Sequence, residues 1–110
     1  MNIQTRDESD VKIVYLEGEM DTNTSPQVQK ELDALRDNGV TKMLLNLEKL
    51  DFISSAGLRV LLATAQQLKA SGGDFRVCQL NKDIKEVFDI SGFSTLLRVF
   101  DNEAKGISGM

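Results

Sequence analysis

The chain alternates between short strand-like segments and amphipathic helix-like segments along most of its length. Lys42 to Leu47 is an almost continuous apolar run, the pattern of a central strand covered on both faces. Apolar residues then keep a helical spacing from Leu58 to Leu68, and another short apolar strand follows from Phe75 to Cys78. Because parallel strands need crossover connections, usually helices, this alternation predicts an α/β fold with a mostly parallel central β-sheet.

The remaining elements complete an expected sheet of four to five strands covered by about four helices. Asn2 to Arg6 and Val11 to Glu17 flank a polar turn and are expected to form a hairpin that adds an antiparallel N-terminal edge strand. Ser25 is expected to cap a helix that has Pro26 in its first turn and ends near Asp37. Further along we expect a helix capped by Asn81 and ending at Ser91-Gly92, a brief helical turn over Phe93 to Leu97, a last strand over Arg98 to Phe100, and a frayed tail in which Asn102 caps one polar turn.

The length and composition predict one domain, residues 1–110, with a core of its own. A chain of 110 residues buries about two-thirds of the surface that its unfolded form exposes. No apolar run approaches the ~18 residues needed to cross a bilayer, and the N-terminus lacks the pattern of a secretory signal. We therefore expect a cytoplasmic protein without membrane contact. Cys78, the single cysteine, excludes an internal disulfide and is expected to be a core thiol.

Charge and residue types exclude several classes of function. A net charge of −4 argues against sequence-independent nucleic-acid binding, which needs a basic surface. The chain has no histidine, so a Ser-His-Asp triad is impossible and the commonest metal ligand is missing. Gly72-Gly73 fits a helix stop and no phosphate-binding glycine motif. The sequence thus predicts a protein-binding module that is not an enzyme and needs neither cofactor nor metal.

Two adjacent hydroxyl side chains, Ser54 and Ser55, stand where a buried strand region gives way to the best-defined helix. A helix begins with four backbone N–H groups that lack intrahelical partners and with the positive end of its dipole. A serine there caps the helix, and a phosphate there would be stabilised, so position alone leaves both uses open. The loops Gly18 to Thr24 and Glu48 to Ser54 both follow strands and should therefore be neighbours at the carboxyl edge of the sheet.

Four short segments, in this order and spacing, resemble those of a known family. They are Gly18-Glu19-Met20-Asp21, Leu45-Asn46-Leu47-Glu48, Ile53-Ser54-Ser55-Ala56-Gly57-Leu58 and Phe88-Asp89-Ile90-Ser91-Gly92-Phe93. Together with the order of elements they are similar to a bacterial anti-sigma factor antagonist, a stand-alone STAS domain. The likeness covers almost the whole chain.

The resemblance implies a regulator that works by partner switching. In this family the unmodified antagonist binds a serine kinase that is also an anti-sigma factor, which releases a transcription factor. Phosphorylation by that kinase reverses the binding, and a metal-dependent serine phosphatase resets it. The family's acceptor lies two places before a Gly-Leu pair, which identifies Ser55 before Gly57-Leu58. The implied partner-binding residues are Asp21, Ser54, Ser55, Ala56 and Gly57, on a monomer or weak dimer.

Two departures from the family pattern leave alternatives open. Ser54 stands where Asp is usual and is expected to cap the helix in its place, so it is kept only as a less favoured acceptor than Ser55. Ala56 stands where a second hydroxyl is usual and removes one competing hydroxyl. A STAS adaptor or scaffold subunit that is never phosphorylated is the alternative function. Asp21 has two interpretations, a local turn or cap and a place in the partner-facing surface.

Overall fold

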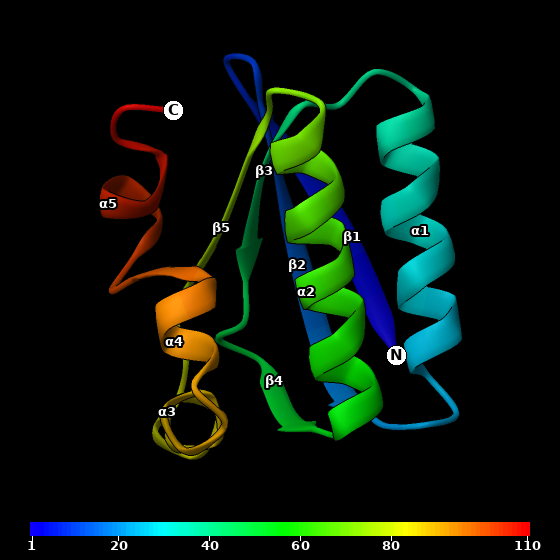
Figure 1. The fold of residues 1–110 in the computed structure, drawn as a ribbon, viewed down its shortest axis with the longest axis vertical. Coiled ribbons are helices and arrows are strands. Elements are labelled where there is room, and N and C mark those ends of the chain that lie inside the picture. Colours follow the sequence, from blue (N-terminus) through cyan, green and yellow to red (C-terminus); the bar gives the residue numbers. More distant parts are fainter.

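A computed structural model describes residues 1–110, which form a six-stranded sheet and five helices (Figure 1). The strands are β1 (Asn2–Glu8), β2 (Val11–Met20), β3 (Lys42–Asn46), β4 (Leu50–Ile53), β5 (Asp74–Cys78) and β6 (Arg98–Phe100). The helices are α1 (Ser25–Asp37), α2 (Ser55–Ala70), α3 (Lys82–Ser91), α4 (Phe93–Leu96) and α5 (Glu103–Ile107). The predicted α/β class is confirmed, with six strands where four to five were expected and five helices where about four were expected.

The sheet is mostly parallel, as predicted. Its strand order is β1-β2-β3-β5-β6, and β4 pairs with the far end of β2. Only β1 runs antiparallel to its neighbour, which confirms the N-terminal hairpin and edge strand. The prediction that Glu48 to Ser54 is only a loop was wrong, because Leu50–Ile53 pairs in parallel with the end of β2. Four residues are too few to show a periodic pattern in the sequence. The strand forms because β2 extends to Met20 and offers it a neighbour to pair with.

Two hydrophobic clusters lie on opposite faces of the sheet. The main cluster joins strand residues such as Leu45 to Leu32 of α1, Leu61 of α2 and Phe88 of α3, all fully buried. Figure 1 shows α1 and α2 side by side over this face. A smaller cluster, which includes Leu44 and Cys78, lies on the other face against α5. Burying one such side chain contributes about 1.5–3 kcal/mol, so packing holds the helices to the sheet.

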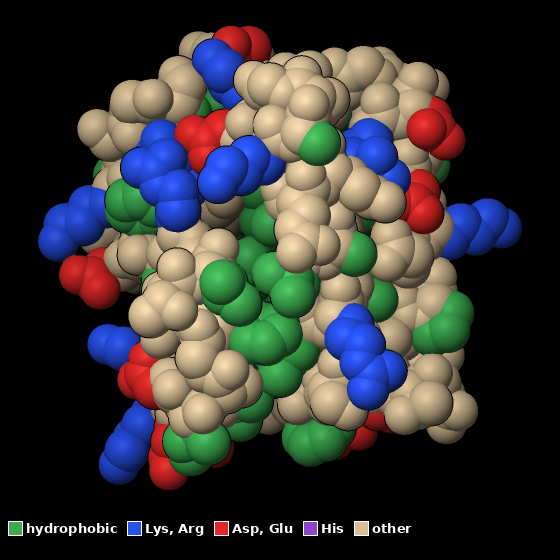
Figure 2. Space-filling model, viewed as in Figure 1, with side chains coloured by type: hydrophobic (Ala, Val, Ile, Leu, Met, Phe, Trp, Pro, Cys, Tyr) green, Lys and Arg blue, Asp and Glu red, His purple; other side chains and the backbone are tan.

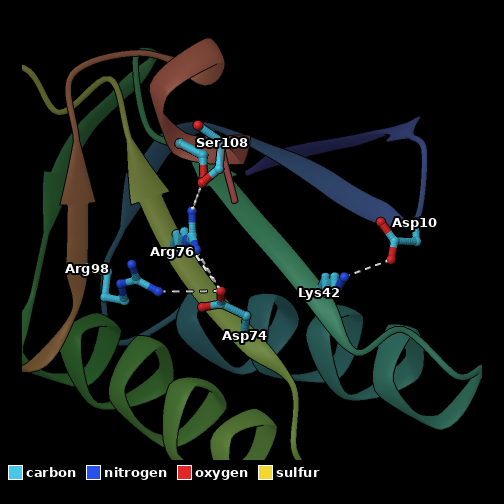
Figure 3. A network of polar contacts seen from close by, with 7 residues as sticks. Asp10, Lys42, Asp74, Arg76, Arg98 and Ser108 are labelled. Carbon is cyan, nitrogen blue, oxygen red and sulfur yellow. Dashed lines mark hydrogen bonds and ion pairs between the residues drawn. The ribbon is translucent and has the colours of Figure 1, made fainter. Parts of the chain in front are cut away.

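The C-terminal tail is docked, and the prediction that it is frayed was wrong. Arg76 of β5 is buried and donates hydrogen bonds from Nη1 to the carbonyl oxygens of Gly106, at 3.0 Å, and Ser108, at 2.7 Å. Its guanidinium also pairs with Asp74 at 2.9 Å (Figure 3). These contacts span about thirty positions, so local sequence patterns did not reveal them. The predicted cap is confirmed, since Asn102 Oδ1 accepts the N–H of Lys105 at 2.9 Å.

The start of α1 also differs from its prediction. Ser25 is the first helical residue and not the cap, and its Oγ donates to the carbonyl oxygen of Asp21 at 2.5 Å. Thr24 occupies the cap position without a side-chain capping bond. The predicted end of α1 at Asp37 is confirmed, as is the helix stop at Gly72-Gly73, since α2 ends at Ala70 and Gly72 has a φ of +82°. No helix combines the length and the apolarity that a bilayer crossing requires.

Candidate functional site

The Ser54-Ser55 junction divides its two hydroxyls between two environments. Ser54 has extended backbone angles and its Oγ accepts the N–H of Gly57 at 3.2 Å, which makes it the N-cap of α2. Ser55 is the first residue of the helix and is exposed. The capping prediction for Ser54 is therefore confirmed. The structure leaves the neighbouring hydroxyl of Ser55 facing solvent at the positive end of the α2 dipole.

The loop that carries Asp21 lies beside this junction, as predicted. The backbone N–H of Ser54 donates to the carbonyl oxygen of Met20 at 2.8 Å, which ties the end of β4 to the end of β2. Asp21 Oδ1 accepts the N–H groups of Asn23 at 2.8 Å and Thr24 at 2.9 Å. The N–H of Thr24 is the main cause that holds the pKa of Asp21 below its usual range. This geometry confirms the local-turn interpretation, and a partner contact by Asp21 stays a prediction.

Gly57 fixes the first turn of α2 against the sheet. A Cβ at this residue would lie 2.8 Å from Cγ1 of Ile53 and 3.0 Å from the carbonyl oxygen of Met20. Gly57 is buried and Asp21, Ser54 and Ala56 are half-buried, so of the predicted partner-binding residues only Ser55 is exposed. Gly57 thus lies behind the surface and sets the distance between helix and strand.

Three helices begin at this one edge of the sheet. α1 follows β2, α2 follows β4 and α3 follows β5, and these strands run in the same direction. Asn81 joins two of these elements, because its Oδ1 accepts the N–H of Ile84 at 2.9 Å while its Nδ2 donates to the carbonyl oxygen of Leu50 at 2.7 Å. The predicted cap at Asn81 is confirmed, and the bond to β4 was not foreseen. The positive ends of three helices therefore lie at the same edge of the sheet as Ser55.

Sequence reasoning also missed an exposed aromatic residue in β4. Pairing between β2 and β4 steps from Gly18 with Leu50 to Glu19 with Phe52, so Asp51 has no partner on β2. Phe52 is 47% exposed, although Leu50 and Ile53 are buried. The only sequence signal was the spacing of these apolar residues, which does not alternate as a regular strand requires.

The other candidate groups in the chain are structural. Cys78 is buried, which confirms the predicted core thiol, and burial raises its pKa to about 12. A thiol with this pKa is almost wholly protonated at neutral pH and is therefore a poor nucleophile. No group of three or more His, Cys, Asp or Glu side chains is arranged to hold a metal ion.

Residues 2–106 match the model of the STAS domain. The chain therefore belongs to the STAS domain family, and within it resembles the anti-sigma factor antagonists. It is 41% identical over 87 residues to BtrV of Bordetella bronchiseptica, whose name places it among these antagonists, with 79% of this chain and 75% of that protein covered. It is 32% identical over 111 aligned positions to an anti-sigma F factor antagonist of Paenibacillus polymyxa, with 98% and 95% covered.

Solved structures with the same fold include the Bacillus anti-sigma factor antagonist SpoIIAA in two forms. The unphosphorylated form has a TM-score of 0.73 at 21% identity and covers 94% of this chain and 91% of its own. The phosphorylated form has a TM-score of 0.72 at 22% identity and covers 94% and 95%. Both forms of SpoIIAA match this chain about equally well, so one fold accommodates both.

Proposed function

We propose that this protein is an anti-sigma factor antagonist that acts as a partner switch and is controlled by phosphorylation of Ser55. Unmodified, it binds an anti-sigma factor that is also a serine kinase, and a transcription factor is released. The kinase transfers the γ-phosphoryl group of ATP to Ser55 Oγ, with release of ADP and the hydroxyl proton, and the complex separates. A serine phosphatase restores the unmodified form. The chain itself acts only by binding and as the substrate of these enzymes.

The observation that carries this proposal is the division between the two serines. The Ser54 hydroxyl accepts the N–H of Gly57 and is engaged in capping, whereas Ser55 is exposed one residue later. A phosphoryl group on Ser54 would disturb the cap, while one on Ser55 extends into solvent beside the start of α2. The two side chains are chemically the same, so this difference in their surroundings is what supports Ser55 over Ser54 as the acceptor.

The same edge explains how a phosphate can release a partner without unfolding the domain. A phosphoserine carries about −1.5 to −2 charges at neutral pH. The positive end of a helix stabilises such a charge by about 0.3–1 kcal/mol, so the free protein tolerates it. A close interface must instead remove its water, and every 1.4 kcal/mol lost weakens binding about tenfold. We therefore expect phosphorylation to change affinity far more than fold, consistent with both SpoIIAA forms sharing this architecture.

Phosphorylation of the purified chain tests the proposal directly. The chain is incubated with ATP and with each purified anti-sigma factor kinase of its source organism, and phosphopeptides are mapped by mass spectrometry. We expect one phosphate, on Ser55, that is lost in Ser55→Ala and kept in Ser54→Ala. Binding of the phosphorylated chain to that kinase should be weaker by tenfold or more.

A STAS adaptor that is never phosphorylated is the second candidate, and Ser54 in place of the usual Asp favours it. Such an adaptor would bind its partner equally well with Ser55 or Ala at this position and would carry no phosphate in cells. Intact-mass measurement of the native protein under several growth conditions separates the two functions. Absence of the phosphate in all of them, with no transfer in vitro, would overturn the switch.

A further inference from the structure

We infer that Phe52 is an aromatic anchor that inserts into an apolar pocket of the anti-sigma factor kinase. This inference rests on the proposed function and adds a residue to its binding surface. Ser55 would then control release of the kinase, whereas Phe52 would supply affinity for it.

The exposure of Phe52 is built into the backbone. In a regular strand, Leu50 and Phe52 would lie on the same face and Ile53 on the other. Because Asp51 is the extra residue of a bulge, Leu50 and Ile53 are both buried and Phe52 is 47% exposed. Bulges re-aim side chains in this way and are over-represented next to functional sites. The bulge directs the ring outward, so Phe52 does not occupy a position in the core.

The place of Phe52 connects it to the switch. β4 leads directly into Ser54 and α2, and Phe52 pairs with Glu19, two residues before Asp21. Of the three exposed large hydrophobic side chains, Phe52, Ile90 and Leu96, only Phe52 lies on the element that ends at the phosphorylation site. Figure 2 shows hydrophobic side chains along the lower edge of the molecule, over α3 and beside β4 and the start of α2. Aromatic residues, Phe included, are enriched at the centre of protein interfaces.

The residues around Phe52 indicate what kind of pocket on the partner would fit it, namely an apolar pocket with a polar rim. Glu19 and Asp51 are both exposed next to Phe52 in the β2 and β4 ladder. An apolar centre within a rim of charged groups is the usual anatomy of a protein interface. A partner with a hydrophobic pocket bordered by Lys or Arg would match this arrangement.

The test compares Phe52→Thr and Phe52→Ala with wild type, using the purified kinase that phosphorylates Ser55. Thr is β-branched and suits a strand better than Ala does, so it is the second variant in case Ala disturbs the fold. We expect the Kd, measured by calorimetry with ADP present, to rise about tenfold or more in both variants. The KM for Ser55 phosphorylation should rise by a similar factor while kcat stays unchanged, because an anchor that does not touch the reacting atoms contributes binding and not chemistry.

Leu96→Ala is the matched control. Leu96 is 60% exposed, and it lines a hollow with Lys69 and Gly72 near the other end of α2. This variant should bind as wild type does. Wild-type Kd and KM in the Phe52 variants, or an equal loss in Leu96→Ala, would overturn the anchor and leave the phosphorylation switch standing. If no anti-sigma factor kinase binds the wild-type chain, both proposals fail together.

Discussion

Gly57 is the residue at which the site tolerates least change. Its neighbours Ile53 and Met20 already lie where a side chain would go, and one of the contacts is a backbone carbonyl that cannot rotate away. The first turn of α2 is therefore set by the absence of a Cβ. A larger residue there must move the helix, and Ser55 with it.

Gly57→Ala should lower the free energy of unfolding by about 1–3 kcal/mol, the usual cost of overpacking. Helix propensity alone would favour Ala by up to about 1 kcal/mol, so a loss of stability isolates the steric effect. Urea unfolding followed by circular dichroism measures the change. Gln66→Ala, at an exposed residue of the same helix, is the control and should be within about 0.5 kcal/mol of wild type. A Gly57→Ala protein as stable as wild type would contradict the packing described here.

Ser54 should contribute to stability, and its neighbour should not. Ser54→Ala removes the capping bond to Gly57 and should cost about 0.5–2 kcal/mol. Ser54→Asp keeps an acceptor and adds negative charge at the helix start, so we expect it to be at least as stable as wild type. Ser55→Ala is the matched control, with a stability close to wild type. Thermal and urea unfolding of the three variants check this order, and an equal loss at both serines would contradict the division of roles.

At the scale of elements, α5 has only five residues, too few for a helix to be stable on its own, so it depends on its contacts with the sheet. Arg76 holds it through the two carbonyl oxygens of Gly106 and Ser108. Arg76→Ala leaves these two carbonyl oxygens without their side-chain donor and leaves Asp74 with only the longer contact to Arg98, at 3.5 Å, so we expect a loss of about 1–3 kcal/mol and a tail released from the sheet. Hydrogen exchange of the α5 amides should rise to the unprotected rate. Retained protection in this variant would show that apolar packing alone holds the tail.

Glu103 makes the docking of α5 dependent on pH. Burial acts to raise its pKa, but hydrogen bonds from Tyr15, Asn46 and Arg6 together outweigh burial and leave the pKa below its usual range. A carboxyl whose pKa is lower in the folded state stabilises the fold above its unfolded pKa, about 4.3, and loses this contribution as pH falls through the folded value. The stability advantage of wild type over Glu103→Gln should thus be present at pH 7 and shrink below about pH 4.3. Urea unfolding across this range measures it, and an advantage that does not vary with pH would contradict the assignment.

At the scale of the whole molecule, the longer edge of the sheet is protected against pairing. β1 is one of the two edge strands, the other being the three-residue β6, and it carries Arg6, Asp7 and Glu8 in an exposed row. Charged residues on an edge strand disfavour the addition of a second chain. We therefore expect a monomer of about 12.2 kDa by light scattering at the highest soluble concentration. Substituting Thr for Arg6 and Val for Glu8 should promote association, and a wild-type dimer that pairs through β1 would contradict this reasoning.

Most of the architecture followed from local patterns in the sequence. Continuous apolar runs located the central strands, and helical spacing with Ser54 and Asn81 as caps located α2 and α3. What the sequence did not reveal depends on contacts between distant residues. Leu50–Ile53 is a strand because the end of β2 lies beside it, and the tail docks because Arg76 reaches it from β5. The site was predicted through Ser54 and Ser55, but Phe52 was missed because its exposure results from a bulge.

Because Cys78 is buried beneath α5, the reactivity of its thiol reports when the C-terminal helix separates from the sheet. This is the only cysteine in the chain, and Ile107 of α5 and Met110 pack against its cluster. Thiol reagents attack the thiolate, and burial raises the pKa to about 12, so the closed protein should react slowly. Each labelling event then records a moment at which the C-terminal helix has left the sheet. The rate of labelling, with and without a bound kinase, measures how often that happens.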